Sequence, residues 1–246
     1  MAEQEKRHRH AHFVGLLTFA SGCVDVVTLM LIGGAFTSVI TGNLIFVGRA
    51  AGTTSLTPAV HAILAIIGYV LGVAVGSRLR VLFARPARGR PVPGPAALAP
   101  APPWPVSATR VLAIECAILA ALNAAWIGYG GGLPGTGPPA VATDLMLAAA
   151  ALALGMQGAA ARGIEGNPST TYMTGALTAL VEALATGRGN SADASAVAGL
   201  IALVAGAACG AVLVRYASQA ALLPPLAALL VVVAAKLRQH RREGRA

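Results

Sequence analysis

The sequence predicts an all-α membrane protein with about six transmembrane helices, two short re-entrant or broken helices that each contain a Thr-Gly pair, and an inverted internal repeat. Three observations predict this fold class. The 246 residues are 56% hydrophobic and 11% charged, whereas soluble domains contain about 25% charged residues. The apolar residues form runs long enough to cross a bilayer, and a similar Thr-Gly element occurs in each half of the chain.

Long apolar runs recur from the first tenth of the chain to its end. A bilayer crossing needs about 20 such residues. The first run contains a single acid, Asp25, and ends at Gly33 and Gly34. A turn rich in glycine and proline, residues 130–139, separates two later runs. We expect helices over residues 12–32, 36–51, 61–79, 111–129, 141–161, 169–185, 192–214 and 220–235.

Residues 84–108 interrupt this pattern, because they are rich in proline, alanine and arginine. Proline lacks the backbone donor and clashes with the preceding helical turn, so this segment cannot be one continuous helix. We interpret it as a cytoplasmic linker within a single membrane domain. The expected parts of that domain, 1–246, are a first repeat core (12–83), the linker (84–108), a spanning helix (109–130), a second repeat core (141–216) and a last spanning helix (219–237).

The net charge of +9 is gathered mainly at the ends of the apolar runs. Such flanking Lys and Arg residues orient membrane proteins with their positive ends in the cytoplasm, so we expect a lipid bilayer as the partner and no nucleic acid. Both termini are then cytoplasmic, in the inner membrane of a bacterium. The main basic blocks are Lys6, Arg7 and Arg9; Arg78, Arg80, Arg85, Arg88, Arg90 and Arg110; and Lys236, Arg238, Arg241, Arg242 and Arg245.

The two halves of the chain carry similar elements in the same order. Residues 36–44 align without gaps with residues 169–177, which places Thr41 opposite Thr174. In the runs that follow, Gly72 and Gly76 match Gly206 and Gly210, and in the preceding runs Asp25 lies nearly opposite Gln157. Three successive elements in the same order favour duplication over chance similarity between helices rich in alanine and glycine.

The positions of the charges constrain the topology. If the three basic blocks are cytoplasmic, an even number of crossings separates each pair. The Thr-Gly elements then enter the membrane without crossing it, which leaves six spans and gives the two halves opposite orientations. Secondary transporters often have this plan, with substrate sites at broken helices near the midplane. An eight-span arrangement with the linker outside remains the alternative, because residues 169–185 are just long enough to span.

These motifs resemble a known family. The first is Gly22-x-x-Asp25, followed by Gly33-Gly34-x-Phe36 and by residues 41–44, Thr-Gly-Asn-Leu. The second half has Gly155-x-Gln157 and then residues 170–178, Thr-Thr-Tyr-Met-Thr-Gly-Ala-Leu-Thr. Together they are similar to the YoaK-like family, domain of unknown function 1275, over nearly the whole chain. The resemblance implies a bacterial multi-pass membrane protein whose activity is not established.

Asp25 is the sharpest functional candidate, because a charged residue at the bilayer centre costs about 2.5 to 3.5 kcal/mol. It would bind a proton or cation, or else form a neutral hydrogen bond to a neighbouring helix. Around it we expect a substrate or ion path that follows both Thr-Gly elements. The other path candidates are Thr37, Thr41, Gly42, Asn43, Gln157, Thr170, Thr171, Thr174, Gly175 and Thr178. Threonine bonds back to its own helix are the alternative interpretation.

Three glycines at four-residue spacing, Gly68, Gly72 and Gly76, share one helix face and predict close helix packing, as do Gly206 and Gly210. No phosphate-binding loop, zinc-protease motif or nucleophile elbow is present, and the cysteines lack the spacing of a metal site. We therefore expect no enzyme, no cofactor and no metal. The function hypothesis is a secondary transporter or channel for a small solute or ion, and the alternative is a scaffold or assembly factor. A homo-oligomer is compatible with both.

Overall fold

The computed structural model describes residues 2–84, 104–132, 135–164, 173–187 and 191–243, and every regular element in these ranges is a helix. Thr170 and Thr171, and most of the expected linker, lie outside the described residues. The α-helices are α1 (Ala2–Leu31), α2 (Ile40–Arg49), α3 (Thr57–Phe83), α4 (Val106–Gly128), α5 (Ala140–Ala161), α6 (Met173–Thr186), α7 (Ser191–Tyr216) and α8 (Leu223–Glu243), with short 3₁₀ turns at Ala50–Gly52 and Ser218–Ala220.

The prediction of an all-α protein with six spanning helices is confirmed. Within the described ranges, six helices are long and apolar enough to cross a membrane. They include most of α1 and the whole of α3, α4 and α5. By contrast, α2 has 10 residues and α6 has 14. At a rise of about 1.5 Å per residue, 10 residues extend only about 15 Å, half of a hydrocarbon core about 30 Å thick.

The helix bounds differ from the predicted ones mainly where the prediction relied on the ends of the apolar runs. The helix of the first Thr-Gly element begins at Ile40 instead of at residue 36. The last helix continues to Glu243, well past the predicted end at residue 237. Its final turns contain Lys, Arg and Gln, which are good helix formers, so the helix extends beyond the apolar segment. The predicted glycine-proline turn is present, with positive φ angles at Gly130, Gly131 and Gly132.

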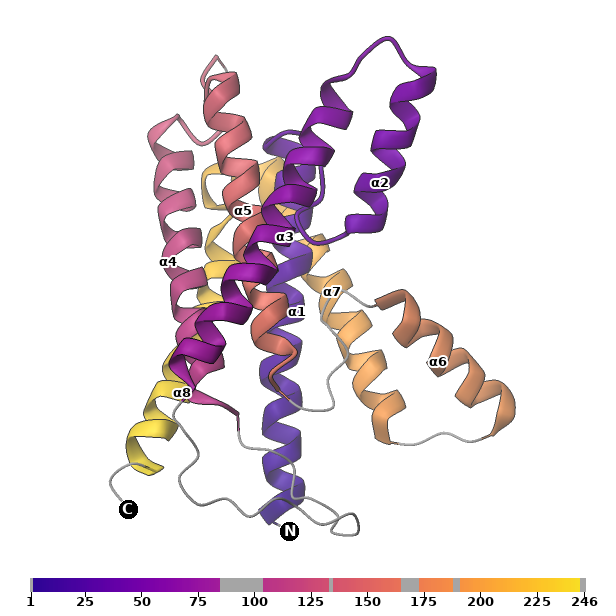
Figure 1. Ribbon diagram of the computed structural model, residues 1–246, viewed down its shortest axis with the longest axis vertical. Coiled ribbons are helices and arrows are strands. Elements are labelled where there is room, and N and C mark those ends of the chain that lie inside the picture. Colours follow the sequence, from indigo (N-terminus) through magenta and orange to yellow (C-terminus); the bar gives the residue numbers. More distant parts are fainter. Residues whose placement is uncertain (1, 85–103, 133–134, 165–172, 188–190, 244–246) are drawn as a thin grey trace.

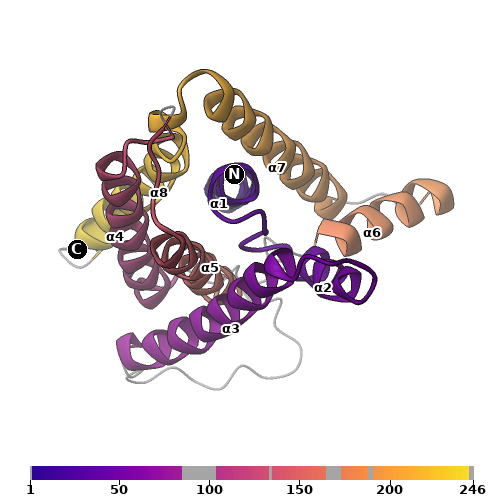
Figure 2. The same ribbon diagram turned by 90° about the horizontal axis from the view of Figure 1, so that it is seen from above.

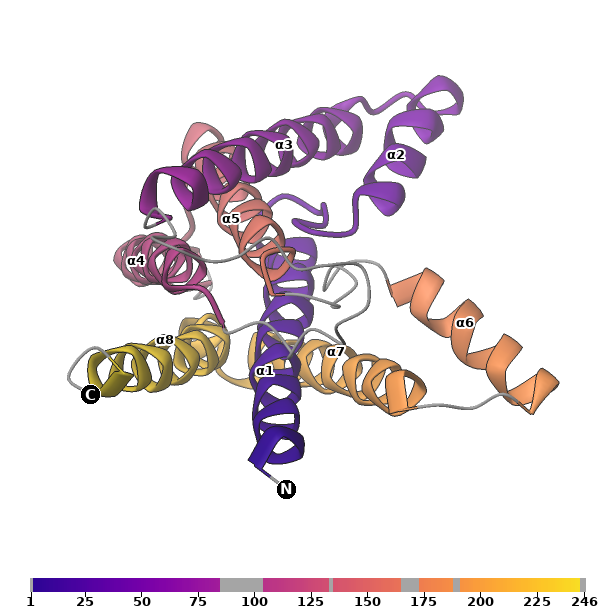
Figure 3. The same ribbon diagram turned by 60° about the horizontal axis from the view of Figure 1, so that its bottom comes forward.

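The helices surround α1, which stands in the middle of the bundle when it is viewed along its length (Figure 2). Helix α1 packs along α7 and also contacts α8 and α5, while α3 packs along α5 and α5 along α4. The two short helices stand on one side of the bundle, α2 against α3 and α6 against α7 (Figures 2 and 3). Both chain termini lie at the same end (Figure 1).

Glycines allow the two most extensive helix pairs to approach closely. A Cβ atom on Gly72 would lie 2.1 Å from the Leu152 carbonyl oxygen, so α3 and α5 touch through their backbones there. A Cβ on Gly206 would lie 2.0 Å from the Phe19 carbonyl oxygen and would separate α7 from α1. Gly68, Gly76 and Gly210 make similar close contacts with α5, α5 and α1. Packing through small residues is how helices associate in lipid, where no hydrophobic force drives them together.

The end of the bundle that holds both termini contains an aromatic and basic cluster. Lys236 of α8 is buried, and its Nζ atom lies 4.5 Å from the ring centroids of both Phe13 and Trp104. The same Nζ donates to Gln239 Oε1 at 3.3 Å. Cations over aromatic faces are stabilised by the ring quadrupole. This cluster joins the beginning of α1 and the entry to α4 with the last helix.

Candidate functional site

The segment between α1 and α2, residues 32–39, is an irregular backbone stretch at the end of the first spanning helix; we call it the α1–α2 connector. Helix α1 ends where two glycines adopt positive φ angles, 106° at Gly33 and 67° at Gly34. Only glycine adopts these angles readily, so the sequence ends the helix and reverses the chain here. The connector then returns along α1 before α2 begins.

Asp25 of α1 binds the returning connector through both carboxylate oxygens. Its Oδ1 accepts hydrogen bonds from the backbone N–H of Thr37 at 2.7 Å, the Thr37 hydroxyl at 2.8 Å and the backbone N–H of Ser38 at 2.8 Å. The Ser38 hydroxyl donates to Oδ2. The whole Asp25 residue is 4% exposed. This acid is therefore surrounded by donors from one short segment, and hydrogen bonds to charged groups are the strong ones.

Asn43, in the first turns of α2, fixes the other part of the connector. Its Nδ2 donates to the Phe36 carbonyl oxygen at 2.6 Å, and its Oδ1 accepts from the Phe36 N–H at 3.0 Å. Gly42 lies beneath the Phe36 ring, where a Cβ atom would come within 3.1 Å of two ring carbons. Thr41 is exposed. Of the first Thr-Gly-Asn motif, the glycine and the asparagine thus hold the connector, and the threonine points elsewhere.

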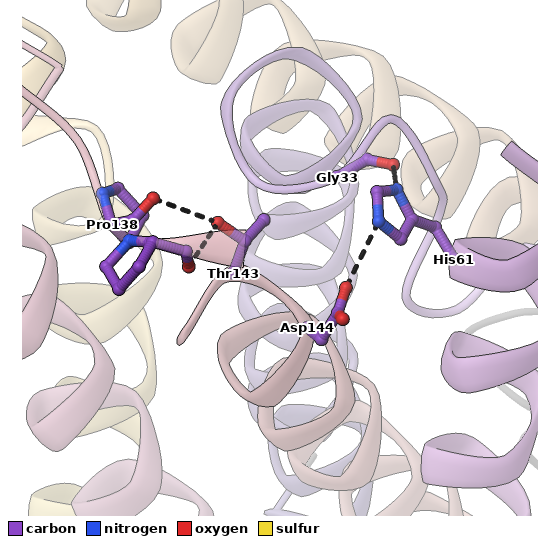
Figure 4. Close-up of polar contacts among 6 residues, drawn as sticks. Gly33, His61, Pro138, Thr143 and Asp144 are labelled. Atoms are coloured by element: carbon purple, nitrogen blue, oxygen red, sulfur yellow. Dashed lines mark hydrogen bonds and ion pairs between the residues drawn. The ribbon is translucent and has the colours of Figure 1, made fainter. Parts of the chain in front are cut away.

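A second polar contact holds the beginning of the connector (Figure 4). His61, in the first turns of α3, bonds through Nδ1 to the Gly33 carbonyl oxygen. On the other side of the ring, His61 Nε2 lies 3.1 Å from Asp144 Oδ1, in the first turns of α5. His61 therefore joins the connector, α3 and α5. A side chain on Gly33 would crowd both Leu147 and His61, at 3.1 and 3.3 Å.

Gln157 lies apart from the connector and bridges α5 to α1. Its Nε2 donates to the Leu17 carbonyl oxygen at 3.0 Å and to the Ser21 hydroxyl at 2.7 Å. Its Oε1 is buried and has no hydrogen-bond partner among the described residues. Ser21 is one helical turn before Asp25 on α1. The predicted amide thus bonds to α1 about one helical turn before the predicted acid, Asp25.

The second Thr-Gly element is more exposed than the first. Thr174 and Thr178 of α6 are exposed, Gly175 is half-buried, and the Thr178 hydroxyl donates to the Thr174 carbonyl oxygen at 2.9 Å. A threonine bond of this kind, back to its own helix, was the alternative to a role in a solute path. Thr170 and Thr171 cannot be placed, because they lie outside the described residues.

One further acid lies inside the bundle, away from both connector contacts. Glu115 of α4 is fully buried, and neither carboxyl oxygen has a hydrogen-bond partner in the described part of the chain. In the same ranges, no group of three or more His, Cys, Asp and Glu side chains is arranged to hold a metal ion.

Sequence reasoning identified Asp25, Thr37 and Asn43, but it missed Ser38 and the contact between His61 and Asp144. Ser38 lies inside the aligned segment, and a hydroxyl next to Thr37 was the available signal. For His61 and Asp144, the available signal was that each is a polar residue near the start of an apolar span. Nothing in the sequence indicates that these two residues meet, because their contact depends on the packing of α3 against α5.

Comparison with known proteins agrees with this architecture. The family described as "Protein of unknown function (DUF1275)" matches residues 13–235. The chain belongs to this DUF1275 family. One relative is the UPF0700 transmembrane protein YoaK of Bacillus subtilis (strain 168), which is 27% identical over 171 residues, or 69% of this chain. The chain spans 64% of the length of that relative. No solved structure matches the chain.

The DUF1275 match confirms the predicted YoaK-like family and covers all six spanning helices at least in part. It extends across the connector, His61 and Asp144, so the candidate site lies inside the matched region. The description of the family assigns no activity. The function of this member must therefore be inferred from the arrangement of its own residues.

Proposed function

We propose that this DUF1275 protein is a secondary transporter or channel for a small solute or ion, in the inner membrane of a bacterium with both termini cytoplasmic. The observation that carries the proposal is the return of the connector to Asp25. Asp25 is six residues before the end of α1, which corresponds to about 9 Å along a helix. Because Thr37 and Ser38 bond to it, α2 begins part-way along the length of α1 and not beyond its end.

A short helix that begins at depth is the element around which transporters build their sites. Figure 1 shows α2 rising from the middle of the bundle toward the end opposite the termini. In the same view, α6 runs from the middle toward the end that holds the termini. Opposite directions of this kind support two re-entrant helices that enter from opposite sides of the membrane.

The helix contacts support an inverted repeat that relates α1 to α5, α2 to α6, α3 to α7 and α4 to α8. Under that relation the contact of α1 with α7 corresponds to the contact of α5 with α3, and both pairs are extensive. The contact of α1 with α8 corresponds to that of α5 with α4. Glycines occupy corresponding places in both main pairs, since Gly22 meets the backbone of α7 and Gly155 meets the backbone of α3.

In this proposal, Asp25 is the coupling group. The ionised carboxylate accepts four hydrogen bonds from the connector. Binding of a proton or cation competes with those bonds, because a protonated carboxyl becomes a donor at one oxygen and loses acceptor capacity. The connector and α2 are then released from α1. Ion binding at Asp25 is thereby linked to movement of the helix that would line the path.

The test is a flux assay on purified protein in lipid vesicles, screened with protons, alkali cations and small metabolites. Asp25→Asn keeps the size of the side chain and removes its charge, so flux should fall at least tenfold. His12→Gln, at an exposed position on α1, is the matched control and should keep the wild-type rate. Absence of flux for every screened solute, with a cellular phenotype that Asp25→Asn leaves intact, would lead us to abandon transport.

The alternative, a scaffold without transport, is favoured by the apolar surface of α6 and α7. Ile201, Val204 and Leu184 are 63%, 66% and 72% exposed, and α6 packs against α7. A partner helix or a second copy of the chain would cover such a surface as well as lipid does. A stoichiometric partner that co-purifies with the wild type and is lost in Val204→Ser, in a protein without flux, would establish this alternative.

A further inference from the structure

His61 has two hydrogen-bonding partners that both act as acceptors. The Gly33 carbonyl oxygen bonds to Nδ1, and a carboxylate oxygen of Asp144 lies 3.1 Å from Nε2. A carbonyl oxygen can only accept, so Nδ1 must carry a hydrogen. An ionised carboxylate also can only accept, so Nε2 must carry one as well. A neutral imidazole has a single N–H and cannot satisfy both neighbours.

We propose that His61 and Asp144 form a proton-binding site that locks the α1–α2 connector to α3 and α5. One proton must lie between Nε2 and Oδ1, and in this site it is on the ring, as an imidazolium that faces the carboxylate. When it leaves to water, a nitrogen lone pair faces a carboxylate oxygen at hydrogen-bond distance, which is repulsive. The contact opens, and because Nδ1 keeps its hydrogen and its bond to Gly33, the connector and α3 lose their link to α5 at this point.

The other titratable groups on the surrounding helices have other contacts or lie at other positions. On α1, the Asp25 carboxylate is bonded to Thr37 and Ser38. On α2, the Arg49 guanidinium lies 6.0 Å from the Phe46 ring centroid. The other titratable residues whose side chains are described on α1 and α3 are His12 and Cys23, and Tyr69, Arg78 and Arg80; Arg162 follows the end of α5. Within the described part of the chain, the charge that meets His61 comes from Asp144.

The side chains of this pair are more exposed than Asp25, and both lie near the beginnings of their helices. The His61 side chain is 17% exposed and the Asp144 side chain 38% exposed, whereas Asp25 is 4% exposed. The pair lies near the beginnings of α3 and α5, away from the end that holds the termini (Figure 1). A proton can therefore exchange with the solution on that side without crossing the bundle.

Two of the three anchors of the connector, His61 and Asp25, are ionisable, and Asn43 is the third. The proton between His61 and Asp144 ties Gly33 to α5 through the imidazole ring, while the charge on Asp25 holds Thr37 and Ser38. Loss of a proton weakens the first anchor, and gain of a proton weakens the second. The site described here goes beyond the proposed transport function and exists whether or not the chain moves a solute.

The direct test is nuclear magnetic resonance of protein labelled with ¹⁵N-histidine in lipid nanodiscs, titrated from about pH 5 to about pH 9, a range that includes the ordinary charge change of histidine. One histidine signal, absent in His61→Gln, should report two protonated ring nitrogens at the acid end. It should lose one proton as the pH rises. In Asp144→Asn the amide can donate to Nε2, so the same ring should already be neutral with Nδ1 protonated where the wild type is charged.

A distance measurement tests the lock. Spin labels at Val60→Cys and Leu145→Cys, both at exposed positions, are introduced into protein whose Cys23, Cys116 and Cys209 are replaced by alanine. The wild-type pair should give one narrow distance at the acid end and a longer or broader one at the alkaline end. Asp144→Asn should remove that dependence, and His12→Gln should keep it.

Two outcomes would overturn the proposal: a His61 ring that is neutral across the whole range, or a proton titration that Asp144→Asn leaves unchanged. A label distance that is constant with pH in the wild type would overturn the lock. None of these measurements needs a substrate. A failed flux assay with a positive proton titration would reject transport and keep the site.

Discussion

Asn43 and Phe36 form a reciprocal pair, in which the amide side chain of one residue satisfies both backbone groups of the other, at 2.6 and 3.0 Å. An edge of a β-sheet makes the same kind of double contact with a neighbouring strand. Here a single side chain supplies it, and the irregular connector is thereby satisfied inside an apolar bundle, where each unpaired backbone group is costly.

Substitution of Asn43 tests this pairing. Asn43→Ala leaves the N–H and the carbonyl of Phe36 without their partner, at a cost of about 1 to 3 kcal/mol for each buried group. Asn43→Asp is nearly isosteric, yet it keeps only the acceptor and places a carboxylate oxygen against the Phe36 carbonyl oxygen. We expect the melting temperature in detergent to fall in both, and to fall at least as far in Asn43→Asp. A melting temperature in Asn43→Asp equal to that of the wild type would contradict the pairing.

Removal of the charge from Asp25 should loosen one segment and leave the rest of the bundle folded. Asp25→Asn has one acceptor oxygen where the wild type has two, and hydrogen bonds to charged groups contribute about 1.5 to 3 kcal/mol each. Hydrogen exchange measured by mass spectrometry should become faster at the amides of Thr37 and Ser38. Exchange in the middle of α4 should be unaffected. Thr41→Val, at an exposed position, serves as the control and should leave the connector amides protected.

The sequence was sufficient for the parts of this fold that depend on composition and short-range pattern. Six apolar runs, a buried acid at Asp25 and glycines for close packing follow from local residue types. The sequence was insufficient where the chain turns back on itself. Residues 36–39 were predicted to begin the helix of the first Thr-Gly element, but the backbone N–H groups of Phe36, Thr37 and Ser38 bond to Asn43 and Asp25 instead. A contact of this kind depends on three-dimensional packing and leaves no periodic signal.

The same reason explains the missed pair of His61 and Asp144. These residues are on helices that are adjacent in space and distant in sequence, and each is an ordinary polar residue near the start of a span. Their meeting follows from the glycine face that brings α3 against α5. Spacing within one helix can predict that face, but it cannot predict which residues of the partner helix will lie opposite.

The glycine contacts lead to a test with an internal control. Gly72→Ala and Gly206→Ala each place a methyl group about 2 Å from a backbone carbonyl oxygen of the facing helix, and overpacking of this kind typically costs about 1 to 3 kcal/mol. Gly128→Ala is the matched control, because nothing lies within 4 Å of its Cβ position. That control should be neutral or slightly stabilising, since alanine favours helix by about 1 kcal/mol over glycine. Equal melting temperatures in all three variants would disprove the close approach.

The orientation of the two halves is tested by reporter fusions. The proposed arrangement places Gly52, just after α2, outside the cytoplasm, and it places Gly89, which lies outside the described residues, within it. Alkaline phosphatase fused after Gly52 should therefore be active, and fused after Gly89 inactive, with the opposite pattern for green fluorescent protein. An active phosphatase at Gly89 would favour eight crossings and remove the basis for the inverted repeat.

The contacts of α1 also bear on how the protein is made. Its main neighbours include α7 and α8, which leave the ribosome roughly ten to thirty seconds after α1 at synthesis rates of about 5 to 20 residues per second. The acid in α1, Asp25, gains its hydrogen-bond partners much sooner. Its hydrogen-bond partners are only 12 and 13 residues further along the chain, so Asp25 can be capped soon after it leaves the ribosome. The first span can thus enter the bilayer with Asp25 already hydrogen-bonded to Thr37 and Ser38. The helices that later enclose it have not been synthesised at that time.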